Sequence, residues 1–220
     1  MTLFDRLKAD AAEEWRGYVD HAFVRALGDG SLSEAAFRGY LVQDYLFLIQ
    51  FARAYGLAVY KGGRLSDMRS AAATLHAILD VEMDLHVRVC ARWGLTAADL
   101  ESAEEGGACV AYTRFVLDAG LRGDLLDLLT ALSPCVVGYA KIGAALARSG
   151  VADDNPYRAW IEEYAGPAYQ EIAENARATL DRLGEARLTP TRYAELVRLF
   201  GAASRLEAAF WQAALDAPAP

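Results

Sequence analysis

Apolar residues recur every three or four positions along nearly the whole chain, and stretches of alternating β-branched residues are few. Such spacing is typical of α-helices that bury at least one face. Turn-forming and capping segments separate the periodic stretches at 28–34, 61–67, 104–110, 149–156 and 184–190. The pattern therefore predicts an all-α protein, folded as a bundle of seven to eight helices.

Individual residues indicate where several of these helices begin and end. Ser33, Ser66 and Thr96 each precede a periodic stretch, where a hydroxyl can accept a hydrogen bond from the first backbone amides of a helix. Gly94 lies where a helix should end, because glycine tolerates the left-handed conformation there. We therefore expect three capped helix starts and one glycine-terminated helix end at these positions.

Two carboxylates fall on helix faces that are otherwise apolar. Asp44 lies within YLVQDYLFLIQF with Phe47 one turn later, and Glu207 lies within RLEAAFWQAAL ahead of Phe210 and Trp211. Burial raises the pKa of a carboxyl group, which suits it to proton transfer near neutral pH. Spacing alone favours the alternative that both carboxylates are hydrogen-bond partners between helices or capping groups.

The stretch ALSPCVVGYAKIG places a proline and a cysteine inside an apolar helix. Pro134 lacks an N–H and collides with the carbonyl of Thr130, so it should kink the helix at a cost of about 3 kcal/mol. Cys135 follows directly, and Tyr139 lies one turn later on the same face, where a phenol could hydrogen-bond a thiolate or a ligand. The alternative, commoner for cysteine, is a small hydrophobic side chain in the core.

The segment EMDLH places Glu82 and His86 at a spacing that can present two ligands to a metal ion. His86 is the last histidine of the chain, however, and a carboxylate-bridged di-iron site needs a second histidine on another helix. We therefore expect no metal site, and a buried hydrogen bond between Glu82 and His86 instead.

Length and charge limit the classes of function. A chain of 220 residues can bury a sizeable core, which favours a single helical domain over residues 1–220. The formal net charge of -8, from 22 basic and 30 acidic residues, argues against a nucleic acid or an anionic membrane as a partner. No uninterrupted apolar run approaches about 18 residues, so we expect no transmembrane helix.

The cysteines indicate a reducing compartment. Cys90, Cys109 and Cys135 form an odd number without the spacing of a redox or zinc motif. The N-terminus does not show the basic and then apolar pattern of a signal peptide. We therefore expect a cytoplasmic protein with reduced thiols, in which Cys90 and Cys109 are core residues.

The ordered motifs together resemble the TenA family, also called thiaminase II or aminopyrimidine aminohydrolase. The resemblance begins at Trp15 and HAFVRALGDGSLSEAAFRGYLVQDYLFLIQFARA, continues through EMDLH and LSPCVVGYAKIG, and ends at EAAFW. It implies the all-α heme-oxygenase-like bundle of that family. Members of the cysteine-containing branch hydrolyse 4-amino-5-aminomethyl-2-methylpyrimidine to the hydroxymethyl pyrimidine in thiamin salvage, and many also cleave thiamin.

The resemblance also implies roles for individual residues. Cys135 resembles the family's nucleophile, and Glu207 resembles its acid and base in the final helix. Asp44 resembles the group that hydrogen-bonds the aminopyrimidine ring. The remaining predicted substrate-binding residues are aromatic: Phe47, Tyr112, Tyr139, Tyr164 and Phe210.

Three further expectations follow from the family. Members form homotetramers, need no metal or other cofactor, and take a small aminopyrimidine or thiamin as their partner. The family often has tyrosine where this chain has Phe47, within reach of the cysteine, so a hydroxyl partner of the thiol or ring is missing here. We expect this difference to affect the rate and the preferred substrate. The remaining aromatic residues, including Phe23, Phe37 and Trp160, are expected to be core residues.

Two alternative functions stay open at this point. The first is a metal-dependent oxidase on the same fold, against which the lack of any histidine after His86 argues. The second is a non-catalytic pyrimidine-binding or regulatory protein. The presence of both Cys135 and Glu207 favours catalysis, because binding alone does not need a nucleophile.

Overall fold

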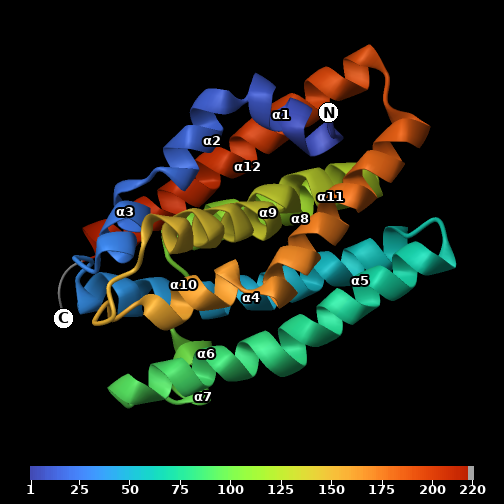
Figure 1. The fold of residues 1–220 in the computed structure, drawn as a ribbon. Helices are drawn as coiled ribbons and strands as arrows, with labels where there is room; N and C mark the ends of the chain where they lie inside the picture. Colours follow the sequence, from blue (N-terminus) through green and yellow to red (C-terminus); the bar gives the residue numbers. More distant parts are fainter. Residues whose placement is uncertain (218–220) are drawn as a thin grey trace. The chain divides into compact units, whose positions relative to one another are not determined.

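The structure is a computed structural model that describes residues 1–217, apart from the side chains of Val81 and Leu85. This part of the chain is helical and contains no strand, which confirms the all-α prediction (Figure 1). The α-helices are, in chain order, α1 (Leu3–Asp10), α2 (Ala12–Val19), α3 (Ala22–Asp29), α4 (Glu34–Lys61), α5 (Leu65–Ala77), α6 (Met83–Cys90), α7 (Ala97–Ser102), α8 (Gly107–Arg122), α9 (Leu125–Ser149), α10 (Arg158–Ala165), α11 (Pro167–Arg187) and α12 (Pro190–Asp216).

These helices outnumber the predicted seven to eight, because short breaks divide stretches that the periodicity presents as continuous. A π-helical turn, Ile78–Glu82, joins α5 to α6, and a 3-10 turn, Ala91–Trp93, follows α6. Gly94 then ends the segment with a left-handed backbone, φ 74°, as predicted. Local turns of this kind leave the apolar spacing almost unchanged, so the sequence pattern does not reveal them.

The capping predictions have mixed outcomes. Thr96 caps α7 as expected, in a capping box with Asp99. Helix α4 begins directly after Ser33. The prediction for Ser66 is wrong, because the extended backbone of Arg64 already starts α5 at Leu65, which leaves Ser66 inside the first turn.

The described chain divides into two compact units. The first unit comprises residues 1–33 and 129–215, and the second comprises Glu34–Leu128 with Asp216 and Ala217. Helix α9 continues from the last residues of the second unit into the first. The single domain expected from the sequence stays a proposal.

Aromatic side chains form the core of the first unit. Trp15 of α2 stacks on Phe200 of α12, with ring centroids 5.7 Å apart, and the edge of Phe4 meets both rings. Farther along α12, Trp211 stacks on Phe23 of α3 with a centroid distance of 4.7 Å. Phe23 is fully buried, as expected of a core residue. The N-terminal helices α1 to α3 are thereby packed along α12.

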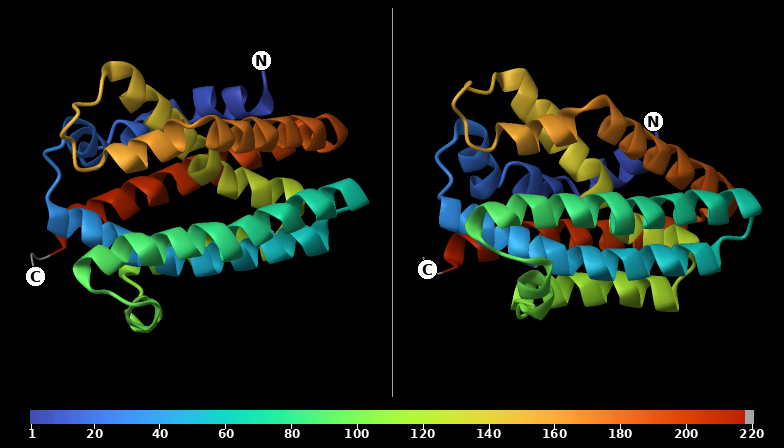
Figure 2. Two further views of the ribbon diagram at one scale, coloured as in Figure 1. Left: turned by 60° about the horizontal axis from the view of Figure 1, so that its bottom comes forward. Right: turned by 90° about the horizontal axis from the view of Figure 1, so that it is seen from below.

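The second unit is built around the long helix α4. Helices α5 and α6 return alongside α4, as both views of Figure 2 show, and α8 also packs against α4. Lys61, at the end of α4, donates a hydrogen bond to the carbonyl of Gly123 at 2.7 Å. Trp93 donates its indole N–H to Glu34 at the start of α4, at 2.6 Å. Polar contacts therefore fix both ends of α4 within this unit.

Helix α9 is long and apolar enough to span a membrane by length and composition, alone among the helices of residues 1–217. Its most apolar window has a mean hydropathy of 1.4, and 89% of that window is buried inside the protein. Burial of this kind is what a core helix shows, because its apolar faces are already covered by other helices.

Two glycines of α9 allow close approach of other helices. A Cβ atom at Gly143 would lie 2.7 Å from the backbone carbon of Tyr164 and 2.8 Å from the nitrogen of Ala165. A Cβ atom at Gly138 would lie 2.4 Å from the ring of Tyr18. The contact at Gly143 involves backbone atoms, which cannot rotate away, so Gly143 determines how closely α10 approaches α9.

Replacement of Gly143 by alanine tests this packing. We expect Gly143→Ala to lower the free energy of unfolding by about 1–3 kcal/mol, because the new methyl group would force the backbone of α10 outward. Gly17, which has no atom within 4 Å of an added Cβ, provides the matched control at an exposed position of α2. Gly17→Ala should raise the stability by about 0.5–1 kcal/mol. Urea denaturation measures both, and equal midpoints for the two variants would contradict the packing.

Candidate active site

Asp44 is buried near the middle of α4, with a relative exposure of 6%. Its Oδ2 atom lies 2.7 Å from Nε2 of His86 on α6 and 3.2 Å from the hydroxyl of Tyr40, one turn earlier on α4. A buried carboxylate needs partners of this kind, since leaving it unpaired would be strongly unfavourable. The sequence correctly indicated a buried Asp44 on an apolar face.

His86 is held at both ring nitrogens. Its Nδ1 atom lies 3.1 Å from the backbone carbonyl of Glu82, and its side chain is 6% exposed. The predicted hydrogen bond between Glu82 and His86 therefore exists, although it uses the main chain of Glu82. Burial disfavours the imidazolium, but the hydrogen bond and charge of Asp44, with help from Glu82, outweigh it and raise the pKa of His86.

Two aromatic residues predicted to bind substrate lie together in the second unit. The rings of Phe47 on α4 and Tyr112 on α8 have centroids 5.1 Å apart at an angle of 33°. The ring of Phe51, one turn later on α4, stacks on the ring of Phe47 with a centroid distance of 5.5 Å. Phe47 follows Asp44 by one helical turn, so the structure brings Asp44, Phe47 and Tyr112 into one region of this unit.

Gln43, the residue before Asp44, fixes the start of α8 against α4. Its side-chain amide donates to the carbonyl of Glu104 at 3.0 Å, and its oxygen accepts the backbone N–H of Gly106 at 2.8 Å. Both groups of the amide are therefore paired with the loop before α8. This loop leads into the helix that carries Tyr112.

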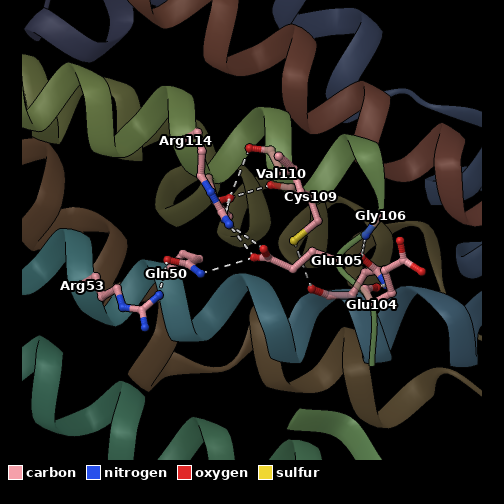
Figure 3. Close-up of polar contacts among 10 residues, drawn as sticks. Gln50, Arg53, Glu104, Glu105, Gly106, Cys109, Val110 and Arg114 are labelled. Carbon is pink, nitrogen blue, oxygen red and sulfur yellow. Dashed lines mark hydrogen bonds and ion pairs between the residues drawn. The ribbon is translucent and has the colours of Figure 1, made fainter. Parts of the chain in front are cut away.

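A neighbouring ion pair strengthens the same connection (Figure 3). Arg114 of α8 donates to both carboxylate oxygens of Glu105, at 2.9 and 2.5 Å, and Gln50 of α4 donates to Glu105 at 3.3 Å. The hydrogen bond from Arg114 lowers the pKa of Glu105. Sequence reasoning missed this network, because its members are spread over residues 43–114 without a common spacing. The one available signal was Gln43, a polar residue beside Asp44 in an apolar helix.

In the first unit, α9 contains Pro134 without interruption. Proline leaves the carbonyl four residues earlier without its helical N–H partner. The hydroxyl of Ser133 donates to this carbonyl, that of Thr130, at 2.9 Å. Ser133 therefore offsets part of the cost of a proline next to Cys135. The kink predicted at Pro134 stays a prediction.

The three cysteines differ in exposure. Cys135 is half-buried, whereas Cys90 and Cys109 are buried. Burial, together with the charge of Asp44, raises the pKa of Cys90 to about 11. Burial raises the pKa of Cys109 to about 12, with a smaller effect of nearby Glu105. The thiolate is the nucleophilic form of cysteine, so Cys90 and Cys109 are poor nucleophiles at neutral pH.

Tyr139 and Tyr164 form part of an aromatic cluster in the first unit. Their ring centroids lie 4.9 Å apart, and Tyr139 also contacts Trp211 of α12 at 5.3 Å. Trp160 of α10 lies 4.5 Å from Tyr164 and is only half-buried. The assignment of Trp160 as a core residue is therefore wrong. Its place beside two predicted substrate-binding tyrosines could not be predicted, because α10 is short and its apolar face is not continuous.

Cys135 lies on α9, and Glu207 lies on α12. Helices α9 and α12 run in the same direction and touch where Tyr139 meets Trp211 (Figure 1). Cys135 precedes Tyr139 by four residues on α9, and Glu207 precedes Trp211 by four on α12, so each shares a helix face with one ring of this contact. Glu207 is 2% exposed and Phe210, on the next turn, is 5% exposed. The predicted nucleophile Cys135 and the buried Glu207 are thus carried by two touching helices.

The structure therefore gathers the predicted residues in two groups. The second unit holds Asp44, Phe47 and Tyr112. The first unit holds the remaining predicted residues, which are Cys135, Tyr139, Tyr164, Glu207 and Phe210. Within residues 1–217, no three or more His, Cys, Asp or Glu side chains come close enough together to hold a metal ion.

Comparison with known proteins identifies the relatives of this chain. The model of the TENA/THI-4/PQQC family matches residues 8–217. A protein of Halalkalibacterium halodurans named aminopyrimidine aminohydrolase is 39% identical over 203 residues, which cover 92% of this chain and 90% of that protein. A crystal structure of a TenA family transcription regulator from Silicibacter sp. TM1040 superposes on this chain with a TM-score of 0.93. The two sequences are 42% identical, and the match covers 98% of this chain and 97% of that chain.

A more distant solved structure defines the class of fold. A domain of unknown function from Shewanella denitrificans with a heme oxygenase-like fold has a TM-score of 0.72 at 16% identity, over 96% of this chain and 91% of that chain. The fold is thus the predicted heme-oxygenase-like helical bundle. The chain belongs to the TENA/THI-4/PQQC family, which confirms the resemblance to TenA and the prediction of an enzyme.

The difference among the cysteines has a direct chemical test. With an aromatic disulfide reagent at pH 8, we expect one thiol of the native protein to react rapidly, because only Cys135 is partly exposed. Cys90 and Cys109 should react only after unfolding in denaturant. Absorbance gives the number of reacted thiols, and peptide mass spectrometry identifies them. Rapid labelling of Cys90 or Cys109 in the native protein would contradict the assignment.

Proposed function

We propose that this protein is an aminopyrimidine aminohydrolase of thiamin salvage. Its substrate would be 4-amino-5-aminomethyl-2-methylpyrimidine, and its product the corresponding 5-hydroxymethyl pyrimidine. Family membership and the relative of that name support the proposal. The observation that carries it is that half-buried Cys135 and buried Glu207 each lie one helical turn before a ring of the Tyr139–Trp211 contact, which joins α9 to α12.

The proposed first step uses Cys135 as a nucleophile. Its thiolate adds to C6 of the pyrimidine ring, which forms an S–C6 bond and breaks the aromaticity of the ring. The ring electrons then expel the amine from the 5-methylene carbon. Glu207 donates a proton to the departing amine and becomes a carboxylate.

The second step restores the enzyme. Water adds to the exocyclic methylene carbon and gives one proton to the Glu207 carboxylate, which forms the hydroxymethyl group. The ring electrons return as the S–C6 bond breaks, so Cys135 leaves as a thiolate and the ring becomes aromatic again. The step consumes one water and needs neither an oxidant nor a metal ion.

The remaining residues bind the pyrimidine in this proposal. Asp44 pairs with the amidine-like edge of the ring, where a carboxylate can hydrogen-bond the exocyclic amine or a protonated ring nitrogen. The aromatic residues contact the flat ring, at about 0.5–1.5 kcal/mol per good stacking contact beyond area burial. These residues are Phe47, Tyr112, Tyr139, Tyr164 and Phe210.

The assembly and the location of the protein are also proposed. Resemblance to TenA supports a homotetramer, which sedimentation velocity would measure. The odd number of cysteines without a disulfide-type pattern supports a cytoplasmic location.

A second candidate function is pyrimidine binding without turnover, as part of a regulatory protein. The relative from Silicibacter sp. TM1040, described as a transcription regulator, is the observation that favours it. This candidate predicts a bound pyrimidine that is recovered unchanged, and it has no use for a nucleophilic cysteine and a buried acid.

Incubation of the purified protein with the aminomethyl pyrimidine, and separately with thiamin, distinguishes the two candidates. We expect chromatography to show the hydroxymethyl pyrimidine accumulating with time and with enzyme concentration from at least one of the two substrates. Product from only one of them would identify the preferred substrate. No product from either would contradict the proposal, and binding without product would support the regulatory function.

Two variants test the assigned chemistry. Glu207→Gln keeps the shape of the side chain but cannot donate a proton as the acid does, so turnover should fall by about 10²–10⁴ while the helical circular dichroism is unchanged. The turnover of Cys135→Ser should fall by a similar factor, because a serine hydroxyl is a much weaker nucleophile than a cysteine thiolate. Cys90→Ser provides the matched control and should retain turnover. A Cys135→Ser variant with most of its activity would rule out the covalent route.

A further inference from the structure

The pairing of Asp44 with His86 is not needed for any step proposed above. The two side chains come from α4 and α6, 42 residues apart in the chain, and are 8% and 6% exposed. Two ionisable groups in such a place are costly unless they are well hydrogen-bonded. The cost of burying this pair indicates that its hydrogen bond has a function, and the effect of His86 on Asp44 is the place to look for it.

The hydrogen bonds define where the protons lie. The carbonyl of Glu82 can only accept a hydrogen bond, so we assign a hydrogen to Nδ1 of His86. The proton between Nε2 and Oδ2 of Asp44 is then shared by the pair. With that proton on Nε2, an imidazolium faces a carboxylate and the pair has no net charge. A bond of this charge-assisted kind is stronger than one between neutral groups.

Both hydrogen bonds to Asp44 fall on the same oxygen. Within residues 1–217, His86 and Tyr40 both contact Oδ2, and no hydrogen bond to Oδ1 is found. The carboxylate therefore cannot rotate about its Cβ–Cγ bond without breaking two contacts. One oxygen is anchored, and the other is left for a ligand.

We propose that His86 is a positioning residue that anchors Oδ2 of Asp44 and thereby presents Oδ1 to the amidine-like edge of the pyrimidine. The proposal rests on the function proposed above, because it takes the aminopyrimidine as the ligand of Asp44. His86 acts through Asp44 and does not itself touch the ring. It adds to the site a residue for which the sequence indicated only a contact with Glu82.

The charge of His86 gives the proposal a pH dependence. The groups that act on the ring of His86 are Asp44 from α4 and Glu82 from the preceding turn, and Tyr40 of α4 contacts the same oxygen of Asp44. The raised pKa of His86 means that the imidazolium persists above the usual value of 6.5 and is lost as the pH rises through the raised pKa. Substrate binding should therefore be strongest below that pKa and should weaken above it.

Two substitutions of His86 separate positioning from general stability. In His86→Leu the anchor is absent, and we expect the KM for the aminomethyl pyrimidine to rise by about 10–100-fold, the usual range for losing a hydrogen bond to a charged group. In His86→Gln an amide N–H can still reach Asp44, so part of this loss should be recovered. The glutamine does not titrate, so the decline in kcat/KM at high pH that His86 causes should be absent.

Tyr40→Phe provides the matched control. It removes the neutral donor from the same oxygen but leaves His86 in place, so the KM should rise less than in His86→Leu and the decline at high pH should remain. Thermal unfolding of every variant is measured in parallel. If His86→Leu does not fold, His86→Gln decides the question by its pH profile.

The outcomes keep the two proposals apart. The role of His86 would be overturned if His86→Leu kept the wild-type turnover and KM and if His86→Gln kept the wild-type pH profile. That result would leave the proposed function standing. Lower thermal stability with those kinetic values unchanged would likewise show that His86 is only structural. No product from the wild type would contradict the proposed function, and the role of His86 would fall with it.

Discussion

A buried carboxylate in the middle of α4 is the constraint on which the arrangement of the second unit depends. Asp44 is 6% exposed, and an ionised side chain so far from water requires partners. Tyr40 supplies one from the same helix, but a charged partner must come from another element. Helix α6 supplies this partner in His86, whose Nε2 atom lies 2.7 Å from Oδ2 of Asp44. Helix α6 begins directly after a π-helical turn, and such turns are frequent at functional sites.

The first unit meets a similar constraint in α9. Pro134 removes a backbone hydrogen bond inside a long apolar helix, and Ser133 gives the buried carbonyl of Thr130 a new partner. Gly143 lets the backbone at Tyr164 approach, so that its ring reaches Tyr139. In α4 and in α9, therefore, a residue that is unfavourable inside an apolar helix lies close to residues assigned to the pyrimidine chemistry, and nearby side chains satisfy its hydrogen bonds.

The sequence pattern was sufficient for features that depend on one helix at a time. Apolar periodicity predicted the all-α fold, and a charged residue on an apolar face indicated the burial of Asp44 and Glu207, which the structure confirms. Spacing within one helix cannot report partners on another, so His86 was matched with Glu82 and its contact with Asp44 was missed. The break at Arg64 and the half-buried Trp160 depend on local backbone geometry and on neighbouring helices, which the pattern does not contain.

The central claim is that an anchored carboxylate recognises the pyrimidine ring. The most direct measurement is a crystal structure with the product, 4-amino-5-hydroxymethyl-2-methylpyrimidine, bound. The account predicts that the amidine-like edge of the ring lies within hydrogen-bond distance of Asp44 Oδ1, while Oδ2 keeps His86 and Tyr40 as partners. A product bound away from Asp44, or held by a rotated carboxylate that has lost His86, would contradict the account.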